Sequence, residues 1–261
     1  MVPAWLTDTV TRDLDRALHY TLLWGLEAVE LRTVGGAAER VPFVNEAKLR
    51  RRLAEHELPV AAIVPGLFEG PASDRAAWMN EVAALEETLA FCARIGCTRV
   101  VTSAFSDEGH APAMAAEALR RAGEAAARRG ITLAVLNEAG MAHPTAAAVA
   151  ELLDAVGHPA VQAAWHPAEA LRAGEPAETG LAALGTRIAL VRCSDQDHPG
   201  DAGQPVEVGD GAVGWPAVLC RLHDQGYDGP VSLEVRREPR PRTGLRDATR
   251  LIQYLRAARR P

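Results

Sequence analysis

The sequence predicts an α/β fold, a single (β/α)8 TIM barrel that takes up residues 1–261 as one domain. The first observation is the length, because 261 residues are close to the usual size of one such barrel. The second is the alternation of short apolar strands with helices, which indicates parallel pairing and right-handed crossovers. The third is a repeated phrase in which a helix ends on glycine and an apolar strand runs into a glutamate, at Gly25–Arg32 and again at Gly226–Val235.

The first half of the chain has clear helix and strand boundaries. Gly25 and Gly96 follow helical patterns and are typical C-caps, and Asn45 is a typical N-cap. The Pro65-Gly66 pair stops the third strand. We expect strands at Pro3–Leu6, Ala28–Leu31, Val60–Val64 and Arg99–Thr102, and helices at Thr11–Leu23, from the Asn45 cap to about Glu57, at Ser73–Ile95 and at Pro112–Arg129.

The second half repeats the same unit. Gly130 ends the fourth helix and Thr145 opens the next. An open doubly wound sheet is the alternative topology, but it usually carries a glycine-rich phosphate turn after an early strand, and the sequence shows none. We expect strands at Ile131–Leu136, Val161–Trp165, Ile188–Cys193 and Val231–Val235, and helices at Thr145–Val156, in short pieces within Pro167–Leu184, at Trp215–Gln225 and at Thr243–Ala258.

Composition excludes several classes of protein. The net charge of −6 and the lack of a strongly basic stretch before the C-terminus argue against nucleic acid as the partner. No apolar stretch approaches transmembrane length and the N-terminus lacks the pattern of a signal peptide, so we expect no membrane association. The spacing of the four cysteines fits neither a metal site nor a disulfide framework, which predicts reduced thiols and a cytoplasmic protein: Cys92, Cys97, Cys193 and Cys220.

Polar residues gather where the predicted strands end. In a (β/α)8 barrel the carboxyl ends of the strands form the face that carries the chemistry. We therefore expect these side chains to open onto one cavity: Glu30, Ser103, Asn137, Glu138, His166, Glu169, Arg192, Asp195, Glu234 and Arg236.

Three segments resemble a known family. They are Gly25–Arg32, Trp165–Gly174 and Val208–Leu219 continuing to Glu234. Their order and phrasing resemble the xylose isomerase-like TIM barrels of the sugar phosphate isomerase/epimerase family, over nearly the whole chain. The resemblance implies carbohydrate metabolism and a small sugar-like substrate. It also implies a divalent metal on four strand-end ligands.

The ligand positions of that family are poorly matched here. Its strand-five glutamate corresponds to Leu136, its strand-six aspartate to His166 and its strand-seven histidine to Arg192, and only Glu234 keeps its ligand. The family set carries three negative charges, whereas the residues here sum to zero when histidine is neutral. Arginine cannot bind a metal, and a buried carboxylate needs a partner, so we expect Arg192 to pair with Glu234 or a neighbouring acid. We therefore predict no cofactor.

An alternative metal set remains open. Strand alternation places Glu138 on the same side as Leu136, so Glu138, His166 and Glu234 could together bind Mn, Mg or Zn. Arg192 nearby counts against such a site. For Glu30 we expect a simpler role, in an ion pair with Arg32 or a neighbouring strand.

The resemblance implies an isomerase or epimerase that moves a proton next to a carbonyl through an enediolate. Glu234 would be one acid or base, His166 or Glu138 the other, and Arg192 the electrophile. Residues expected to bind substrate are Glu30, Ser103, Asn137, Glu169, Asp195 and Arg236.

We favour an enzyme, but two alternatives stay open: a non-catalytic barrel that binds a metabolite or partner, and a dehydratase or lyase on the same scaffold. An abasic-site endonuclease shares the fold but needs several metals, for which the sequence lacks ligands. The substrate and the oligomeric state, a homo-oligomer included, are open.

Overall fold

The chain forms a closed barrel of parallel strands. The computed structural model describes residues 1–36, 39–109 and 111–259. The strand order around the barrel is β1-β10-β7-β6-β5-β4-β3-β2, and β1 closes the ring by pairing with both β2 and β10. This confirms the predicted fold class. The strands are β1 (Val2–Leu6), β2 (Ala28–Leu31), β3 (Val60–Ile63), β4 (Arg99–Thr102), β5 (Thr132–Leu136), β6 (Val161–Trp165), β7 (Ile188–Cys193) and β10 (Pro230–Leu233).

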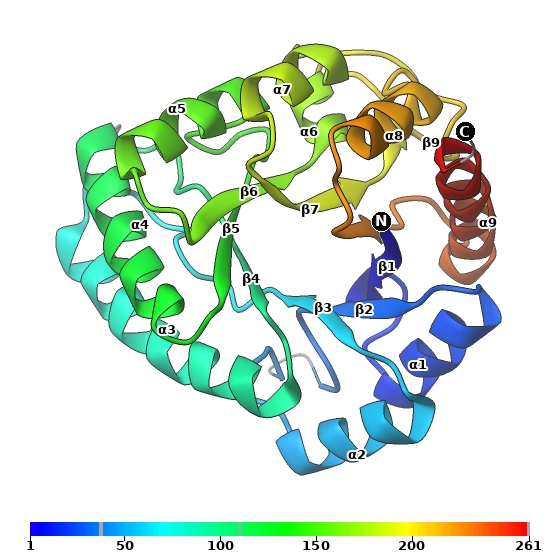
Figure 1. Cartoon of the computed structure of the whole chain (residues 1–261), viewed down its shortest axis with the longest axis horizontal. Coiled ribbons are helices and arrows are strands. Elements are labelled where there is room, and N and C mark those ends of the chain that lie inside the picture. The colour runs from blue at the N-terminus through cyan, green and yellow to red at the C-terminus, as the bar shows by residue number, and fades with distance from the viewer. Residues whose placement is uncertain (37–38, 110, 260–261) are drawn as a thin grey trace.

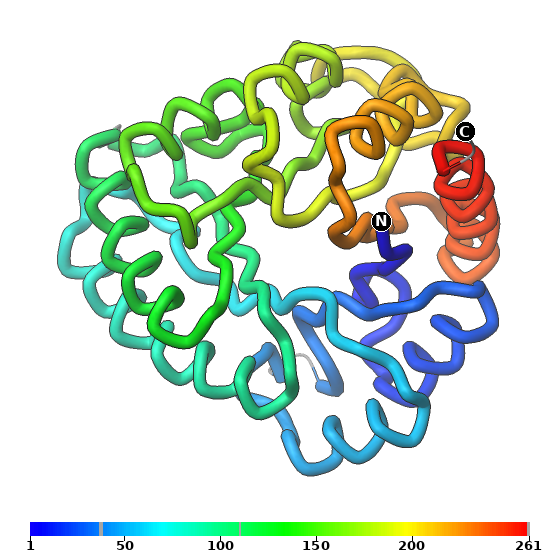
Figure 2. Tube along the Cα trace, in the orientation of Figure 1, coloured from blue at the N-terminus to red at the C-terminus, as the bar shows by residue number. Residues whose placement is uncertain are grey.

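Helices form an outer ring around these strands (Figure 1). Figure 2 follows the chain around that ring, from the N-terminus inside it to α9 on the outside. The expected caps are in place, since the side chain of Asn45 accepts from Lys48 N and that of Thr145 accepts from Ala148 N. The helices are α1 (Leu14–Leu23), α2 (Glu46–His56), α3 (Arg75–Ile95), α4 (Pro112–Ala127), α5 (Ala146–Val156), α6 (Pro167–Arg172), α7 (Ala177–Leu184), α8 (Trp215–Asp224) and α9 (Arg240–Ala258).

Two apolar layers hold the barrel together. The larger lies between strands and helices and includes the buried indoles of Trp5, Trp78, Trp165 and Trp215. A smaller layer lies inside the barrel and contains mostly small or medium side chains, such as Leu6, Ala62, Ala134, Leu136, Ala164 and Leu190. Because alternate strand residues point inward, small residues in this inner layer leave room for longer polar side chains nearer the mouth.

The structure adds elements that the sequence patterns did not predict. A 3-10 helix at Thr7–Thr9 follows β1, and a short antiparallel ribbon of β8 (Asp195–Gln196) and β9 (Pro205–Val206) follows β7. The last strand ends at Leu233, so Glu234 lies directly after it. The four cysteines are free in the structure, and three of them are buried: Cys92, Cys97 and Cys193.

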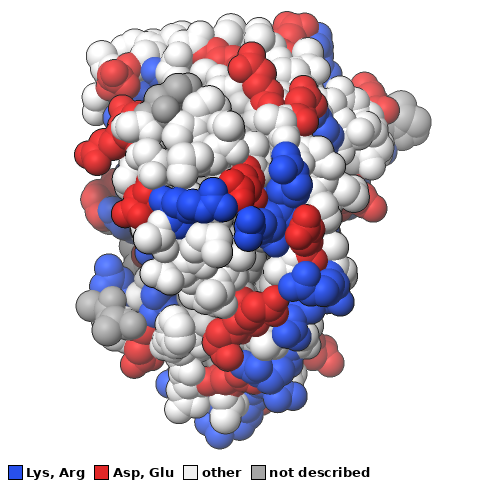
Figure 3. Space-filling model, turned by 90° about the vertical axis from the view of Figure 1, so that its left-hand side faces the viewer, with Lys and Arg blue, Asp and Glu red and all other residues white. Residues whose placement is uncertain are grey.

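Acidic and basic side chains alternate on the outer face formed by α3 and α4 (Figure 3). Ion pairs link Arg75 and Arg121 to Glu117, and Arg128 and Arg129 to Glu86. Such exposed pairs contribute little stability each. Within the described part of the chain, none of the helices is both long and apolar enough to cross a membrane.

Candidate functional site

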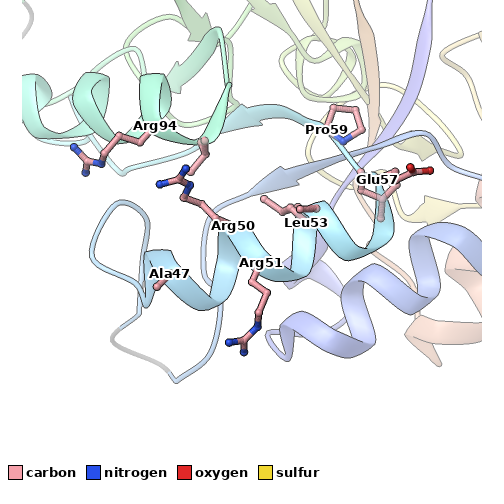
Figure 4. A pocket seen from close by; sticks show the side chains of 10 residues that line it. Ala47, Arg50, Arg51, Leu53, Glu57, Pro59 and Arg94 are labelled. Atoms are coloured by element: carbon pink, nitrogen blue, oxygen red, sulfur yellow. The ribbon is translucent and has the colours of Figure 1, made fainter.

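A hollow of about 640 Å³ lies outside the barrel, between α2 and the end of α3 (Figure 4). It borders Pro59, which precedes β3, so it lies toward the amino ends of the strands rather than the face that carries chemistry. Arg50 and Arg94 at its edge are both within 4.0 Å of Glu46. These arginines therefore have partners, and the hollow lacks a cluster of reactive groups.

A second cavity, of about 540 Å³, opens at the carboxyl ends of the strands. Every barrel strand or the loop after it contributes at least one residue to its wall. Six of the ten predicted side chains line it: Ser103, Glu138, His166, Arg192, Glu234 and Arg236. The remaining lining residues are Asp8, Arg12, Arg32, Thr33, Arg40, Val64, Glu69, Leu136 and Met141. We take this cavity as the candidate site.

Arg192 and Glu30 form a buried ion pair beneath this cavity. A terminal nitrogen of Arg192 on β7 donates to Glu30 Oε1 on β2, and Ser232 Oγ on β10 donates to Glu30 Oε2. The side chains of Glu30 and Arg192 are 0% and 3% exposed. Burial raises the pKa of Glu30, while the Arg192 cation and the Ser232 hydroxyl act in the opposite direction. The pair crosses the barrel and neutralises both charges.

This geometry decides one expectation and corrects another. Arg192 was expected to pair with Glu234 or a neighbouring acid, and its partner is Glu30 rather than Glu234. Glu30 was expected to pair with Arg32 or a neighbouring strand, but Arg32 Nε donates to Asp8 at 2.8 Å instead. The physical reason is depth. Ser232 is paired in register with Arg192 and its hydroxyl donates to Glu30, so these three side chains meet inside the barrel, whereas Glu234 follows the end of β10 nearer the mouth.

Two carboxylates, Glu138 and Glu234, line the cavity from different sides. Glu138 follows β5, and its side chain makes no hydrogen bond or ion pair with the described residues. Burial raises the pKa of Glu138, and the negative charges of Glu169 and Glu234 raise it further. Glu234 lies 3.3 Å from Arg236 Nε and 3.8 Å from His166 Nε2. Carboxyls in such contrasting surroundings suit an acid and a base.

His166 is a buried, fixed imidazole. Asn137 holds its backbone from both sides, accepting from His166 N at 2.7 Å and donating to His166 O at 3.0 Å. The ring nitrogen Nε2 lies 2.9 Å from Ser194 Oγ. Burial lowers the pKa of His166 well below 6.5, and the Arg236 cation lowers it further. The ring is therefore neutral near pH 7 and can donate or accept a hydrogen bond.

Besides Glu30, three residues predicted to bind substrate lie outside the cavity lining and support its walls. Asn137 fixes His166, as described above. Glu169 accepts from Ala139 N at 3.0 Å and pairs with Arg236. Asp195 holds the loop after β9, because its carboxylate accepts backbone N–H groups of Gln196, Gly209, Gly211 and Val213.

Sequence reasoning missed the side of the mouth built by the loops after β1, β2 and β3. Asp8, Arg12, Arg40 and Glu69 line the cavity there. They sit two or more residues beyond the strand ends, in segments without periodicity. Their place in loops at the carboxyl ends of strands was the available signal, since such loops build the active sites of these barrels.

The residues at the family's metal-ligand positions do not fit a metal ion. Leu136 has no donor atom, and Arg192 is a cation held by Glu30. Among the described residues, no group of three or more His, Cys, Asp and Glu side chains is arranged to hold a metal ion. We therefore assign no catalytic step to a metal.

Comparison with known proteins gives a consistent fold. A family model described as a xylose isomerase-like TIM barrel matches residues 19–257. A search of curated proteins found no match.

Solved structures resemble the whole chain at low sequence identity. An L-ribulose 3-epimerase has a TM-score of 0.81 and 17% identity, covering 99% of this chain and 95% of its own. A D-allulose 3-epimerase from Methylomonas sp., solved with D-allulose, has a TM-score of 0.77 and 15% identity, covering 99% and 97%. A probable 3-DHS dehydratase from Bacillus anthracis has a TM-score of 0.80 and 14% identity, covering 97% and 99%. At these identities the likeness shows the fold alone.

Proposed function

The chain belongs to the xylose isomerase-like TIM barrel family, and from that premise we propose that it is an isomerase or epimerase of a small polyhydroxy carbonyl compound that works without a metal. The observation that carries this proposal is the pair of carboxyls, Glu138 and Glu234, on different sides of one cavity above the Glu30–Arg192 ion pair. The epimerases among the structural neighbours support a ketose-like substrate. Such a substrate belongs to carbohydrate metabolism, and four free thiols support a reducing compartment such as the cytoplasm.

The two carboxyls would carry out the proton transfers. Glu234, as carboxylate, takes the proton from the carbon next to the carbonyl. The C–H electron pair forms the enediolate double bond, and the carbonyl electron pair moves onto oxygen. Glu138, whose raised pKa favours its acid form, returns a proton to carbon from the other side. Exchange with water restores both groups, so hydrogen from solvent enters the product.

Arg192 would stabilise the negative charge of the enediolate. It lines the cavity, and Glu30 engages only one of its terminal nitrogens. The Nε–H of Arg192 is buried and has no partner among the described residues, so Glu30 does not satisfy the whole guanidinium. A preorganised cation beside the reacting carbon stabilises a developing oxyanion. The neutral ring of His166 would orient a substrate hydroxyl or the Glu234 carboxylate, 3.8 Å away.

The test is incorporation of solvent deuterium. Ketoses and their acid or phosphate derivatives are incubated with the protein in D2O, and exchange next to the carbonyl is followed by proton NMR. We expect exchange with wild type, and its loss in Glu138→Gln and Glu234→Gln while both variants stay folded. The control is Glu86→Gln, on the outer surface of α3. Binding without exchange would favour the non-catalytic barrel, and net loss of water from the substrate would favour a dehydratase.

A further inference from the structure

We propose that the substrate carries an anionic group, a carboxylate or a phosphate, and that Arg12, Arg32 and Arg40 bind it on one side of the cavity mouth. This inference rests on the proposed function, because it concerns the other end of the same substrate. All three arginines line the cavity together with the reactive groups. Arg12 comes from the loop after β1, and Arg32 and Arg40 come from the loop after β2.

The charges on that side are not balanced by the protein. The three arginines face two carboxylates of the cavity wall, Asp8 and Glu69, which leaves one positive charge in excess. Arg32 pairs with Asp8, while Arg12 forms no ion pair with the described residues. Arg40 pairs with Glu69 at 2.9 Å, but their side chains are 36% and 51% exposed, so the pair contributes little. A substrate anion could therefore replace Glu69 as the partner of Arg40 at small cost.

The backbone holds Arg40 in place at the mouth. Arg40 pairs with Thr33 in an antiparallel bridge, and Val41 N donates to Arg32 O at 2.9 Å, so the two arginines sit on adjoining stretches of chain. Arg40 Nε also donates to Val64 O at 3.3 Å. Gly66 gives the guanidinium its room, because a Cβ there would lie 2.3 Å from its central carbon. A side chain fixed in this way is preorganised for a bidentate anion.

The other arginines near the mouth are already engaged. Arg236, which we expected to bind substrate, is held by Glu169 and Glu234. Arg237 donates to Asp247 at 2.9 Å, and Arg240 donates to Glu238 and to the backbone of Thr9. The anion therefore belongs at the side of β1 and β2.

This arrangement fixes the direction of the substrate. Glu138 and Glu234 repel an anion from their part of the cavity, whereas the three arginines attract it to the other. The carbonyl carbon then lies between the two carboxyls, over Arg192. The distribution of charge in the cavity thus gives the substrate one end that is bound and one end that reacts. Binding energy from the bound end can then contribute to catalysis at the reacting end.

Binding and turnover are measured separately to test this. Dissociation constants for D-fructose, D-fructose 6-phosphate and D-fructuronate are measured by calorimetry with wild type, Arg12→Gln, Arg40→Gln and the control Arg75→Gln, whose arginine pairs with Glu117 outside the barrel. We expect one of the two anionic sugars to bind more tightly than the neutral one. Each cavity variant should weaken that binding about ten- to hundredfold, as for loss of a hydrogen bond between charged groups. The better anion identifies the group as carboxylate or phosphate.

The outcomes separate the two proposals. The subsite is wrong if the neutral sugar binds as tightly as both anions, or if Arg12→Gln and Arg40→Gln both bind the preferred anion like wild type. Where exchange is measurable, the same variants should lower kcat/KM for the anionic sugar, whereas the control Arg75→Gln should keep the wild-type value. Anion binding that depends on these arginines without any deuterium exchange would uphold the subsite and refute the proposed reaction.

Discussion

Arg192 on β7 and Glu30 on β2 pair inside the barrel, where the family resemblance places a metal ligand at the position of Arg192. Three features make this pair a local unit: both side chains are buried, Ser232 completes the hydrogen bonds of Glu30, and the surrounding layer is apolar. In this unit the Arg192 cation neutralises the buried Glu30 carboxylate. The barrel therefore needs no divalent metal ion to balance that carboxylate.

Breaking this pair should destabilise the fold. We expect Arg192→Ala to cost about 3–5 kcal/mol, because it leaves the Glu30 carboxylate buried without its cation. Replacing both residues, as in Glu30→Leu with Arg192→Met, should recover most of that loss. Urea unfolding measures each value. Arg75→Ala is the control and should cost about 0–1 kcal/mol, since its pair with Glu117 is exposed. Equal losses for Arg192→Ala and Arg75→Ala would show that the buried pair is not formed.

Metal binding should return only when the three altered ligand positions are all changed back to the family's residues. Arg192→His alone should bind divalent metal poorly, because Leu136 supplies no donor atom and His166 still occupies the position of the family's aspartate. The triple variant Leu136→Glu, His166→Asp, Arg192→His should bind Mn²⁺ or Zn²⁺ far more tightly. Titration calorimetry compares the two, with wild type as reference. Tight stoichiometric binding by wild type would contradict the assignment of these positions.

Glu138 should make the folded protein less stable as pH rises. The pKa of Glu138 in the folded protein is raised above the ordinary value of 4.5, so protonation of Glu138 favours the folded state. This contribution to the free energy of unfolding is fully present below pH 4.5. The contribution is lost as pH rises through the raised pKa. Glu138→Gln carries no such charge, so its melting temperature should exceed that of wild type at neutral pH, and the difference should shrink below pH 4.5. A Glu138→Gln protein less stable than wild type at neutral pH would refute this.

Asp195 should matter for the loop after β9 rather than for substrate. Asp195→Ala leaves backbone N–H groups unpaired, at a cost of about 1–3 kcal/mol for each group that water cannot reach. Hydrogen exchange at Gly209, Gly211 and Val213 should therefore speed up. The matched control is Asp197→Ala, an exposed carboxylate between β8 and β9. Unchanged exchange at these amides would contradict the assignment.

The barrel was predictable because its signals are local. Strands such as Arg99–Thr102 and Val161–Trp165 are apolar runs preceded by glycine or proline, and caps such as Asn45 mark helix starts within a residue or two. The ribbon of β8 and β9 was not predictable in this way. It has two residues per strand, and it is held by the carboxylate of Asp195 rather than by a hydrophobic pattern.

The sequence predicted which strand-end residues line the site, but not which of them form ion pairs. Strand ends placed Glu138, His166 and Glu234 at one cavity, as the closed barrel requires. The partner of Arg192 depended on the depth of each side chain along the barrel axis. Spacing in the sequence does not tell whether Glu30 or Glu234 lies at the depth of Arg192. Arg12 and Arg40 depended on loop paths, which neither periodicity nor resemblance specifies.

The most direct test of metal-independent proton transfer is the rate of solvent deuterium exchange by protein dialysed against a chelator. The substrate is whichever sugar the wild-type protein exchanges fastest, and residual metal is measured by mass spectrometry on the same sample. The account predicts the full exchange rate at substoichiometric metal, no gain on adding Mn²⁺ or Zn²⁺, and an unchanged melting temperature. Exchange that disappears with the chelator and returns with one equivalent of metal would contradict it.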